Sequence, residues 1–292
     1  MAEFVEIVEV GPRDGLQNEP RPIPATRKVA LVDVLSAAGF RRVEAASFVS
    51  PRWVPQMADG DEVMAQARRR PGTRLMALVP NLRGYEAARR AGADWIAVFT
   101  AATEGFARAN LNATVAESLD RLRPVLGAAR RDGLPVRGYV SVVTDCPYEG
   151  PVAPAAPARV AAALRDMGCD EITLGETLGR GTPERVDALL AAVLQELPSD
   201  RLAGHFHDTA GRALLNVEVA LARGLRVFDG SIAGLGGCPF APGAAGNIAT
   251  EALAEHLARL GYRTGLERDA LARAAALARS IREEAHEPQP QA

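Results

Sequence analysis

Lysine is almost absent from this chain: Lys28 is the only lysine among 34 basic residues. A Schiff-base mechanism would therefore have to use Lys28, which lies in a predicted helix. The phosphate-binding Gly-Lys-Ser/Thr loop is also excluded, since the residue before the lysine is Arg27. The remaining basic residues are arginines, interspersed with acidic residues to a formal net charge of -2. This balance indicates neither a nucleic-acid nor a membrane partner.

Cysteine is scarce as well, with Cys146, Cys169 and Cys238 as the three thiols in 292 residues. Their wide and unmatched spacing fits neither a disulfide framework nor a zinc knuckle, and it is typical of reduced cytoplasmic thiols. No apolar run is long enough to span a bilayer, and the first predicted strand begins at Glu6, which leaves no room for a signal peptide. We therefore expect a soluble cytoplasmic protein.

Short β-type runs alternate with longer amphipathic runs, and the alternation repeats eight times. The helix candidates carry apolar residues at three- and four-residue spacing, and several end at a glycine, as 158–167 does before Gly168. Repeated strand-helix units form a parallel sheet, and eight units are the number that closes a barrel. The predicted strands are 6–10, 42–46, 75–79, 95–99, 136–143, 171–174, 202–207 and 227–232.

An open doubly wound sheet is the competing architecture, and it predicts a dinucleotide-binding fingerprint that is missing here. The nearest match, 234–239, ends in proline and follows a late strand. We therefore predict an α/β fold, a (β/α)8 TIM barrel. A single domain is expected over 1–285, with one or two extra helices after Gly265 and a disordered tail at 286–292.

Three irregular segments, 12–24, 47–55 and 232–246, each follow a predicted strand. In a (β/α)8 barrel the loops after strands lie at the C-terminal face, where active sites are built. We therefore expect the functional residues to come from these segments and from the ends of the strands before them.

The seventh predicted strand carries two histidines, His205 and His207, which are half of the four in the chain. Side chains alternate along a strand, so these imidazoles project to one face while Phe206 points to the other. A barrel would bring the carboxylate of Asp14, after the first strand, to the same mouth. Imidazole and carboxylate ligands together suit Mg, Mn, Co or Zn. The alternative is a pair of histidines satisfied by hydrogen bonds in or near the core.

Arg13 and Glu44 are candidates for anion chemistry beside that site. On pattern alone, Arg13-Asp14-Gly15 is an ordinary turn, since Asp-Gly is a common turn pair. The functional interpretation is that Asp14 supplies a metal oxygen while the rigid guanidinium of Arg13 stabilises an anion. Glu44 lies within an apolar run, where a carboxylate is costly unless paired, so its expected partner is Arg13 or the metal region. A surface-facing strand position is the alternative for Glu44.

The segment 233–247 contains too many glycines for a regular element, and it carries Cys238. It is either a flexible linker or, as a long loop after a barrel strand, a lid over the active site. Asn247 either caps a helix that starts at Ile248 or supplies its amide oxygen as a fourth metal ligand. Glu251 lies one helical turn later and is expected to reach the same mouth.

Five segments resemble the hydroxymethylglutaryl-CoA lyase family, and the similarity extends over 6–265, nearly the whole chain. That family belongs to a wider group of metal-dependent barrel lyases and synthases that share the Arg-Asp-Gly and His-x-His elements. The glycine-rich cysteine loop is among the most specific motifs of the family, and the related synthases generally lack it. The five segments are 8–19, 47–51, 137–141, 205–211 and 234–246.

The resemblance implies a metal site with four ligands and Mg or Mn as the divalent cation. His205 is implied to act in proton transfer besides touching the metal. The implied ligands are Asp14, His205, His207 and Asn247.

The resemblance also implies the residues around that site. Arg13 is implied to stabilise a thioester enolate, and Cys238 to be the catalytic thiol. Glu44 and Glu251 fall on positions that support the site. Glu176 stands where the family has aspartate in a Gly-Asp-Thr motif, so a catalytic side chain expected at the mouth is one methylene longer here.

The sequence therefore predicts a metal-dependent carbon-carbon lyase that cleaves 3-hydroxy-3-methylglutaryl-CoA, or a close analogue, to acetyl-CoA and acetoacetate or another keto acid. One alternative is the same chemistry on another 3-hydroxyacyl-CoA, such as a citramalyl or isoprenoid-derived glutaryl thioester. A second is a barrel that binds a metal and an acyl-CoA without turnover. The expected partners are the acyl-CoA substrate and a second copy of the chain in a dimer, and the family suggests leucine catabolism.

Overall fold

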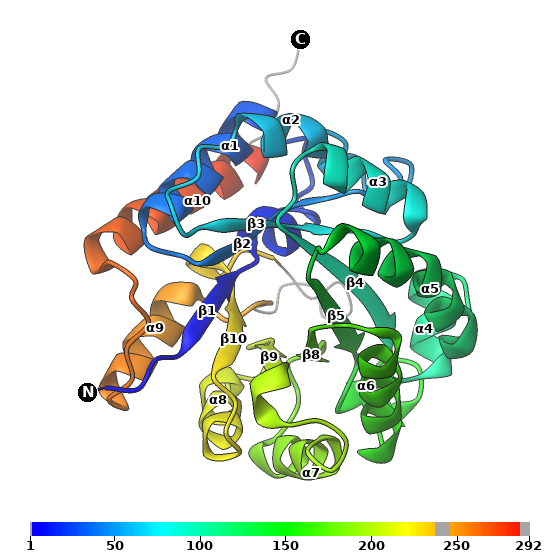
Figure 1. The fold of residues 1–292 in the computed structure, drawn as a ribbon. Helices are drawn as coiled ribbons and strands as arrows, with labels where there is room; N and C mark the ends of the chain where they lie inside the picture. The colour runs from blue at the N-terminus through cyan, green and yellow to red at the C-terminus, as the bar shows by residue number, and fades with distance from the viewer. Residues whose placement is uncertain (1, 237–245, 287–292) are drawn as a thin grey trace.

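The computed structural model describes residues 2–236 and 246–286. Within these ranges, eight parallel strands close a barrel in the order β1-β10-β9-β8-β5-β4-β3-β2, and the helices lie outside it (Figure 1). The predicted (β/α)8 barrel is confirmed, and the competing open sheet is wrong. The strands are β1 (Glu6–Glu9), β2 (Arg42–Ser47), β3 (Arg74–Leu78), β4 (Trp95–Ala101), β5 (Val136–Ser141), β8 (Glu171–Glu176), β9 (Leu202–Phe206) and β10 (Val227–Gly230).

Helices separate the strands along the chain, and local signals set their ends. Thr114 and Glu117 form a capping box at the start of α5, and Gly168, with φ of 108°, follows the last residue of α6. A short antiparallel hairpin, β6 (Asp145–Cys146) and β7 (Gly150–Pro151), follows β5. The helices are α1 (Ala25–Ala37), α2 (Gly60–Gln66), α3 (Leu82–Arg90), α4 (Glu104–Leu111), α5 (Val115–Asp132), α6 (Ala155–Met167), α7 (Pro183–Val193), α8 (Ala213–Ala222), α9 (Thr250–Arg259) and α10 (Arg268–His286).

Two predicted strands are each two residues too long, since the pattern predicts 136–143 and 227–232, whereas β5 ends at Ser141 and β10 at Gly230. Val142 has φ of 56°, in the left-handed region that a β-branched residue rarely adopts and that ends a strand. Its amide donates to Thr177 Oγ1 at 2.9 Å, just beyond the end of β8. The chain therefore turns at this point, and the loops after β5 and β8 meet at the C-terminal face.

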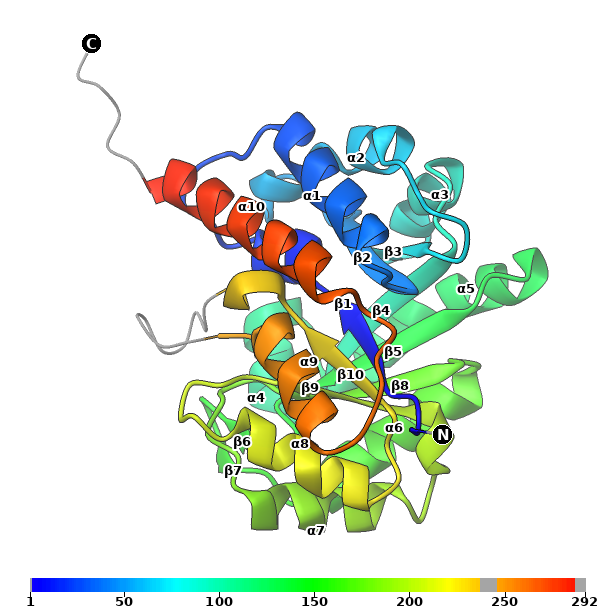
Figure 2. The ribbon, with the colours of Figure 1, turned by 90° about the vertical axis from the view of Figure 1, so that its left-hand side faces the viewer.

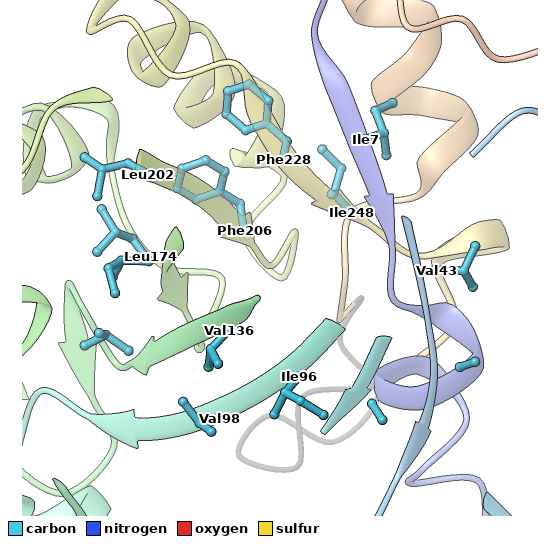
Figure 3. Packing of buried hydrophobic residues seen from close by; sticks show 14 of the residues in the cluster. Ile7, Val43, Ile96, Val98, Val136, Leu174, Leu202, Phe206, Phe228 and Ile248 are labelled. Atoms are coloured by element: carbon cyan, nitrogen blue, oxygen red, sulfur yellow. The ribbon is translucent and has the colours of Figure 1, made fainter. Parts of the chain in front are cut away.

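Most of the apolar core lies between the barrel and the surrounding helices. Alternate side chains along each strand point outward, and most of this outward set is apolar and buried. The rings of Phe206 and Phe228, on neighbouring strands, have their centroids 6.4 Å apart in this layer. Figure 3 shows the packing, with Ile7, Val43, Ile96, Val98, Val136, Leu174, Leu202 and Ile248 among the buried residues.

The barrel interior is divided between apolar and charged side chains. A small apolar cluster that includes Met76 and Leu78 fills part of it, as bulky apolar residues usually do in this fold. The rest holds buried charges, which are tolerated because each has a partner of opposite sign. Ion pairs at 2.6 to 2.8 Å link Glu6, Arg42, Glu171, Arg137 and Asp229 in that order.

One further helix, α10, follows α9, where the sequence predicts one or two. It lies alongside α1 (Figure 2), and Arg27 Nη2 donates to Ser280 Oγ at 2.9 Å between the two helices. Of the predicted tail, His286 is the last residue of α10, and the rest lies outside the described residues. Among the described helices, none has the length and hydropathy needed to cross a bilayer. The domain range 1–285 stays a prediction.

Candidate active site and metal centre

Arg13 and Asp14 lie on a tight helical turn, Gly11–Gly15, directly after β1. The Asp14 amide donates to the Val10 carbonyl at 2.7 Å, which coils the chain as soon as the strand ends. Gly15 packs against the segment after β10, because a Cβ at this position would lie 2.7 Å from Leu235 Cβ. Glycine thus lets the turn lie against the start of the glycine-rich loop.

Three side chains converge at the C-terminal mouth of the barrel. One possible ligand atom from each of Asp14, His205 and His207 lies within 4.8 Å of the others. The two histidine Nε2 atoms face each other at 3.2 Å, as expected for side chains two positions apart around the end of β9. One carboxylate oxygen and two imidazole nitrogens around a common point form a donor set that fits a divalent cation.

Asn247 joins this cluster from the other side of the glycine-rich loop. It forms an isolated antiparallel bridge with His207, and its Nδ2 donates to Asp14 Oδ2 at 2.8 Å. The alternative role as a helix cap is wrong, because α9 begins at Thr250 and is preceded by Ala249. The structure therefore places all four predicted ligand residues together.

Burial and neighbouring charges set the ionisation of the cluster. Burial raises the pKa of Asp14, but Arg13 and His205 outweigh it and hold that pKa well below its usual range. Burial and the nearby His205 lower the pKa of His207 to about 4. Near neutral pH, Asp14 is therefore a carboxylate and His207 a neutral imidazole, which are the forms that bind metal ions.

Arg13 is held by carboxylates on two sides. Its Nη1 donates to Asp14 Oδ1 at 2.5 Å, and its Nε donates to Glu44 Oε1. Glu44 is fully buried and accepts a second hydrogen bond from Tyr139 OH at 2.7 Å. Burial lowers the pKa of Arg13, but Glu44 and Asp14 outweigh this effect and raise it, so the guanidinium stays charged. The expected pairing of Glu44 with Arg13 is confirmed, and the surface-facing alternative is wrong.

His205 is oriented through its other ring nitrogen. Its Nδ1 lies 2.9 Å from Asp229 Oδ2, and Arg137 Nη1 donates to Asp229 Oδ1 at 2.6 Å and to Tyr139 OH at 3.2 Å. Sequence reasoning missed all three of these partners. These partners could have been found by the sequence pattern that identified Glu44, which is a polar or charged residue inside an apolar strand. The same pattern is present in β5 and β10.

Glu176 does not join the cluster. In the register of β8 and β9 it is paired with Phe206, and Gly175 with His205, so Glu176 points to the outer face of the barrel. Its Oε1 accepts from Thr144 Oγ1 and from the Arg180 amide, each at 3.2 Å. The expectation of a side chain at the mouth is therefore wrong, because strand alternation directs Glu176 to the loops around the site.

Two acidic side chains hold the first turn after β10. Glu9 Oε1 accepts from the Ile232 amide at 2.9 Å, and Glu251 Oε2 accepts from the Ala233 amide at 2.9 Å. Glu251 thus contacts the start of the glycine-rich loop instead of the metal cluster. Cys238, predicted to be catalytic, lies outside the described residues.

A cavity of about 750 Å³ opens beside the cluster. Its polar lining includes Arg13, Asp14, His205 and His207, and a volume of this size accommodates an organic substrate as well as an ion. Elsewhere its walls include Val49, Trp53, Leu78, Phe99, Asn110 and Arg121.

Comparisons with known proteins find similarity over almost the whole chain. The HMGL-like family matches residues 4–278. Hydroxymethylglutaryl-CoA lyase of Pseudomonas mevalonii is 52% identical over 270 residues, which cover 92% of this chain and 90% of that protein. The 3-hydroxy-3-isohexenylglutaryl-CoA/hydroxy-methylglutaryl-CoA lyase of Pseudomonas aeruginosa is 53% identical over 267 residues, which cover 91% of this chain and 89% of that protein.

A solved structure extends the likeness to three dimensions. The crystal structure of the HMG-CoA lyase from Brucella melitensis superposes with a TM-score of 0.95 at 57% identity, and the match covers 97% of this chain and 100% of that one. With the family match over most of its length and relatives at this level of identity, the chain belongs to the HMGL-like family.

Proposed function

We propose that this chain is a divalent-metal-dependent carbon-carbon lyase that cleaves 3-hydroxy-3-methylglutaryl-CoA to acetyl-CoA and acetoacetate. The observation that carries the proposal is the turn after β1, where Arg13 Nη1 lies 2.5 Å from the Asp14 carboxylate of the candidate metal cluster. One turn thus places a cation-binding oxygen beside an anion-stabilising guanidinium. The hydroxymethylglutaryl-CoA lyases among its relatives support this activity.

Cleavage between C2 and C3 of a 3-hydroxyacyl thioester sets clear chemical demands. The C3 hydroxyl loses its proton to a base, C3 becomes the ketone of acetoacetate, and the electron pair of the broken bond passes to C2 and the thioester oxygen as an enolate. An acid then protonates C2 to release acetyl-CoA. Asp14, His205, His207 and Asn247 would hold Mg or Mn, and the ion would polarise the substrate oxygens.

Arg13 stabilises the enolate. Its guanidinium stays charged and is already oriented by Glu44 and Asp14, so it needs no rearrangement as negative charge develops on the thioester oxygen. Burial strengthens the effect, because charges interact more strongly away from water. Glu44 serves by fixing the direction of Arg13.

His205 and Cys238 move protons. Burial lowers the pKa of His205, but its contact with Asp229 outweighs burial and raises that pKa, which favours proton uptake at Nε2. Its Nε2 would hold either the ion or a proton, because one lone pair cannot bind both. Cys238 is assigned the protonation of C2, and Glu9 and Glu251 fix the start of its loop.

A second substrate is favoured by the cavity walls. A longer apolar group at C3, as in the isohexenylglutaryl thioester named for the Pseudomonas aeruginosa relative, requires apolar residues within reach of the cluster. Val49, Val54, Leu78 and Phe99 line the same cavity as His205. We therefore propose that the chain also accepts 3-hydroxyglutaryl thioesters with a longer C3 substituent.

A panel of thioesters tests both proposals. The purified chain with Mg or Mn is incubated with the methyl, isohexenyl and citramalyl thioesters, and acetyl-CoA and the keto products are quantified. Turnover of the first two is expected. Turnover of citramalyl-CoA alone would replace the substrate assignment. Binding of all three without turnover would identify a non-catalytic acyl-CoA-binding barrel and refute the proposed activity.

The dimer, the cytoplasmic location and the place in leucine catabolism that the sequence suggests stay predictions.

A further inference from the structure

We infer that Asp229 is a positioning residue that fixes the tautomer of His205, so that Nε2 of this ring directs a lone pair at the metal cluster. Asp229 Oδ2 lies 2.9 Å from His205 Nδ1, while His205 Nε2 faces the cluster at 3.2 Å from His207 Nε2. The inference rests on the proposed function only in taking the cluster as a cation site.

Strand register brings the two residues together. Phe228 of β10 is paired with Gly204 of β9, so the next residues, Asp229 and His205, lie side by side and point into the barrel. The side chain of Asp229 is 1% exposed. Water therefore cannot replace His205 as the partner of this carboxylate oxygen.

Asp229 can only accept hydrogen bonds here. Its other oxygen accepts from Arg137 Nη1 at 2.6 Å. This ion pair with a buried guanidinium keeps Asp229 in its carboxylate form. A carboxylate has no proton to donate, so the hydrogen between it and His205 must be on Nδ1. In a neutral imidazole, Nε2 is then the lone-pair nitrogen that a metal ion requires.

Arg137 prevents Asp229 from turning away. Its side chain is fully buried, and its Nε lies 2.6 Å from Glu171 Oε1. Glu171 is paired in turn with Arg42 Nη1 at 2.8 Å. The ion pairs inside the barrel therefore have a local consequence, because they hold the oxygen that sets the His205 tautomer.

Asp229→Asn is the sharpest perturbation, because it keeps the shape and removes the acceptor-only character. If the asparagine amide nitrogen faced Arg137, two hydrogen-bond donors would face each other. The asparagine oxygen is therefore expected to face Arg137, and its nitrogen to face His205. The asparagine then donates to Nδ1, and the neutral ring carries its proton on Nε2. A protonated Nε2 cannot bind a metal ion.

Two measurements read this out without relying on catalysis. The chain has four histidines, so nitrogen-15 NMR of histidine-labelled protein at alkaline pH resolves which ring nitrogen of each carries the proton. Calorimetric titration with Mn²⁺ gives the metal affinity. We expect the Nδ1-H tautomer of His205 in the wild type, the Nε2-H tautomer in Asp229→Asn, and Mn²⁺ affinity about 10- to 100-fold weaker in the variant.

Asp187→Asn is the matched control, since it makes the same aspartate-to-asparagine change in a surface ion pair, with Arg223, that does not touch His205. It should keep the Nδ1-H tautomer and the Mn²⁺ affinity of the wild type. If both variants lose metal equally, or if Asp229→Asn keeps the wild-type tautomer and affinity, Asp229 has no positioning role.

A second variant tests the same inference if Asp229→Asn does not fold. Arg137→Met combined with Asp229→Ala removes both charges of this ion pair, so neither substitution leaves the other residue as an unpaired buried charge. It should weaken Mn²⁺ binding by the same 10- to 100-fold, and unchanged affinity would overturn the inference. Because tautomer and affinity are measured without substrate, a failure of the proposed lyase activity would leave this result readable.

Discussion

Glu9 is expected to make the stability of this protein fall as the pH rises. Its carboxyl is fully buried on the outer side of β1, where Oε1 accepts from the amides of Gly11 and Ile232 at 2.8 and 2.9 Å and Oε2 accepts from Thr250 Oγ1 at 2.7 Å. Burial outweighs these hydrogen bonds and raises the pKa of Glu9 from 4.5 to about 8. The group is therefore mainly protonated in the folded protein at neutral pH.

The sign and size of the effect follow from proton linkage. Between about pH 4.5 and about pH 8 the folded chain keeps the Glu9 proton while the unfolded chain has lost it, so stability declines across this window. The slope is at most about 1.4 kcal/mol per pH unit, or roughly 4 to 5 kcal/mol over the whole interval. The stabilisation is complete below the unfolded pKa and lost above the folded one.

Glu9→Gln tests this, because glutamine resembles the protonated carboxyl and does not titrate. Urea unfolding of both proteins from about pH 5 to about pH 9 should give similar free energies at the acidic end and an increasing advantage for the variant as pH rises. Glu255→Gln, at an exposed position on α9, is the control and should follow the wild type. Parallel curves for wild type and Glu9→Gln would contradict a raised pKa at Glu9.

Four further variants test individual roles. Glu44→Gln leaves Arg13 without its buried ionic partner and should lower the free energy of unfolding by about 3 kcal/mol along with turnover; unchanged urea unfolding and kinetics would contradict the pairing. His207→Ala should lose bound metal, so full metal content measured in the variant would contradict its assignment as a ligand. Cys238→Ser should reduce turnover about 100-fold or more while Mn²⁺ affinity stays the same, and intact activity would remove the thiol from the mechanism. Glu176→Asp pulls the carboxylate away from the loops outside the cavity and should cost about 1 kcal/mol of stability with turnover retained, whereas a large loss of turnover at unchanged stability would return this residue to the site.

The fold was predictable because each strand is a short apolar run and each helix repeats its apolar residues on one face. The signals that failed concern backbone geometry. The pattern of 136–143 is continuous, yet the chain turns at Val142, where the amide finds Thr177 instead of a neighbouring strand. Apolar periodicity gives no information about the φ angle of a single residue, so it could not predict where this strand ends.

The site was predictable where residue chemistry was unusual. The histidine pair and Glu44 stood out as polar groups in apolar strands, and the structure places them around Asp14 and Arg13. Asp229 and Arg137 carried the same signal, but their partners are fixed by strand register, which sequence spacing does not give.

Glu176 was misplaced for a related reason. It lies beside a glycine in a motif that the family carries at its active site, and sequence proximity suggested a common direction. Alternation along β8 separates the two, because Gly175 is paired with His205 and Glu176 with Phe206. Knowing which residues pair across strands would have corrected the expectation.

The proposed cleavage of a carbon-carbon bond requires a metal ion bound at Asp14, His205 and His207. The most direct test is product formation from 3-hydroxy-3-methylglutaryl-CoA by enzyme stripped with a chelator, before and after Mg or Mn is added. We predict no product from the stripped enzyme and restored release of acetyl-CoA and acetoacetate in equal amounts on addition. Full turnover by the stripped enzyme, or none after addition of either metal, would contradict a metal-dependent lyase activity.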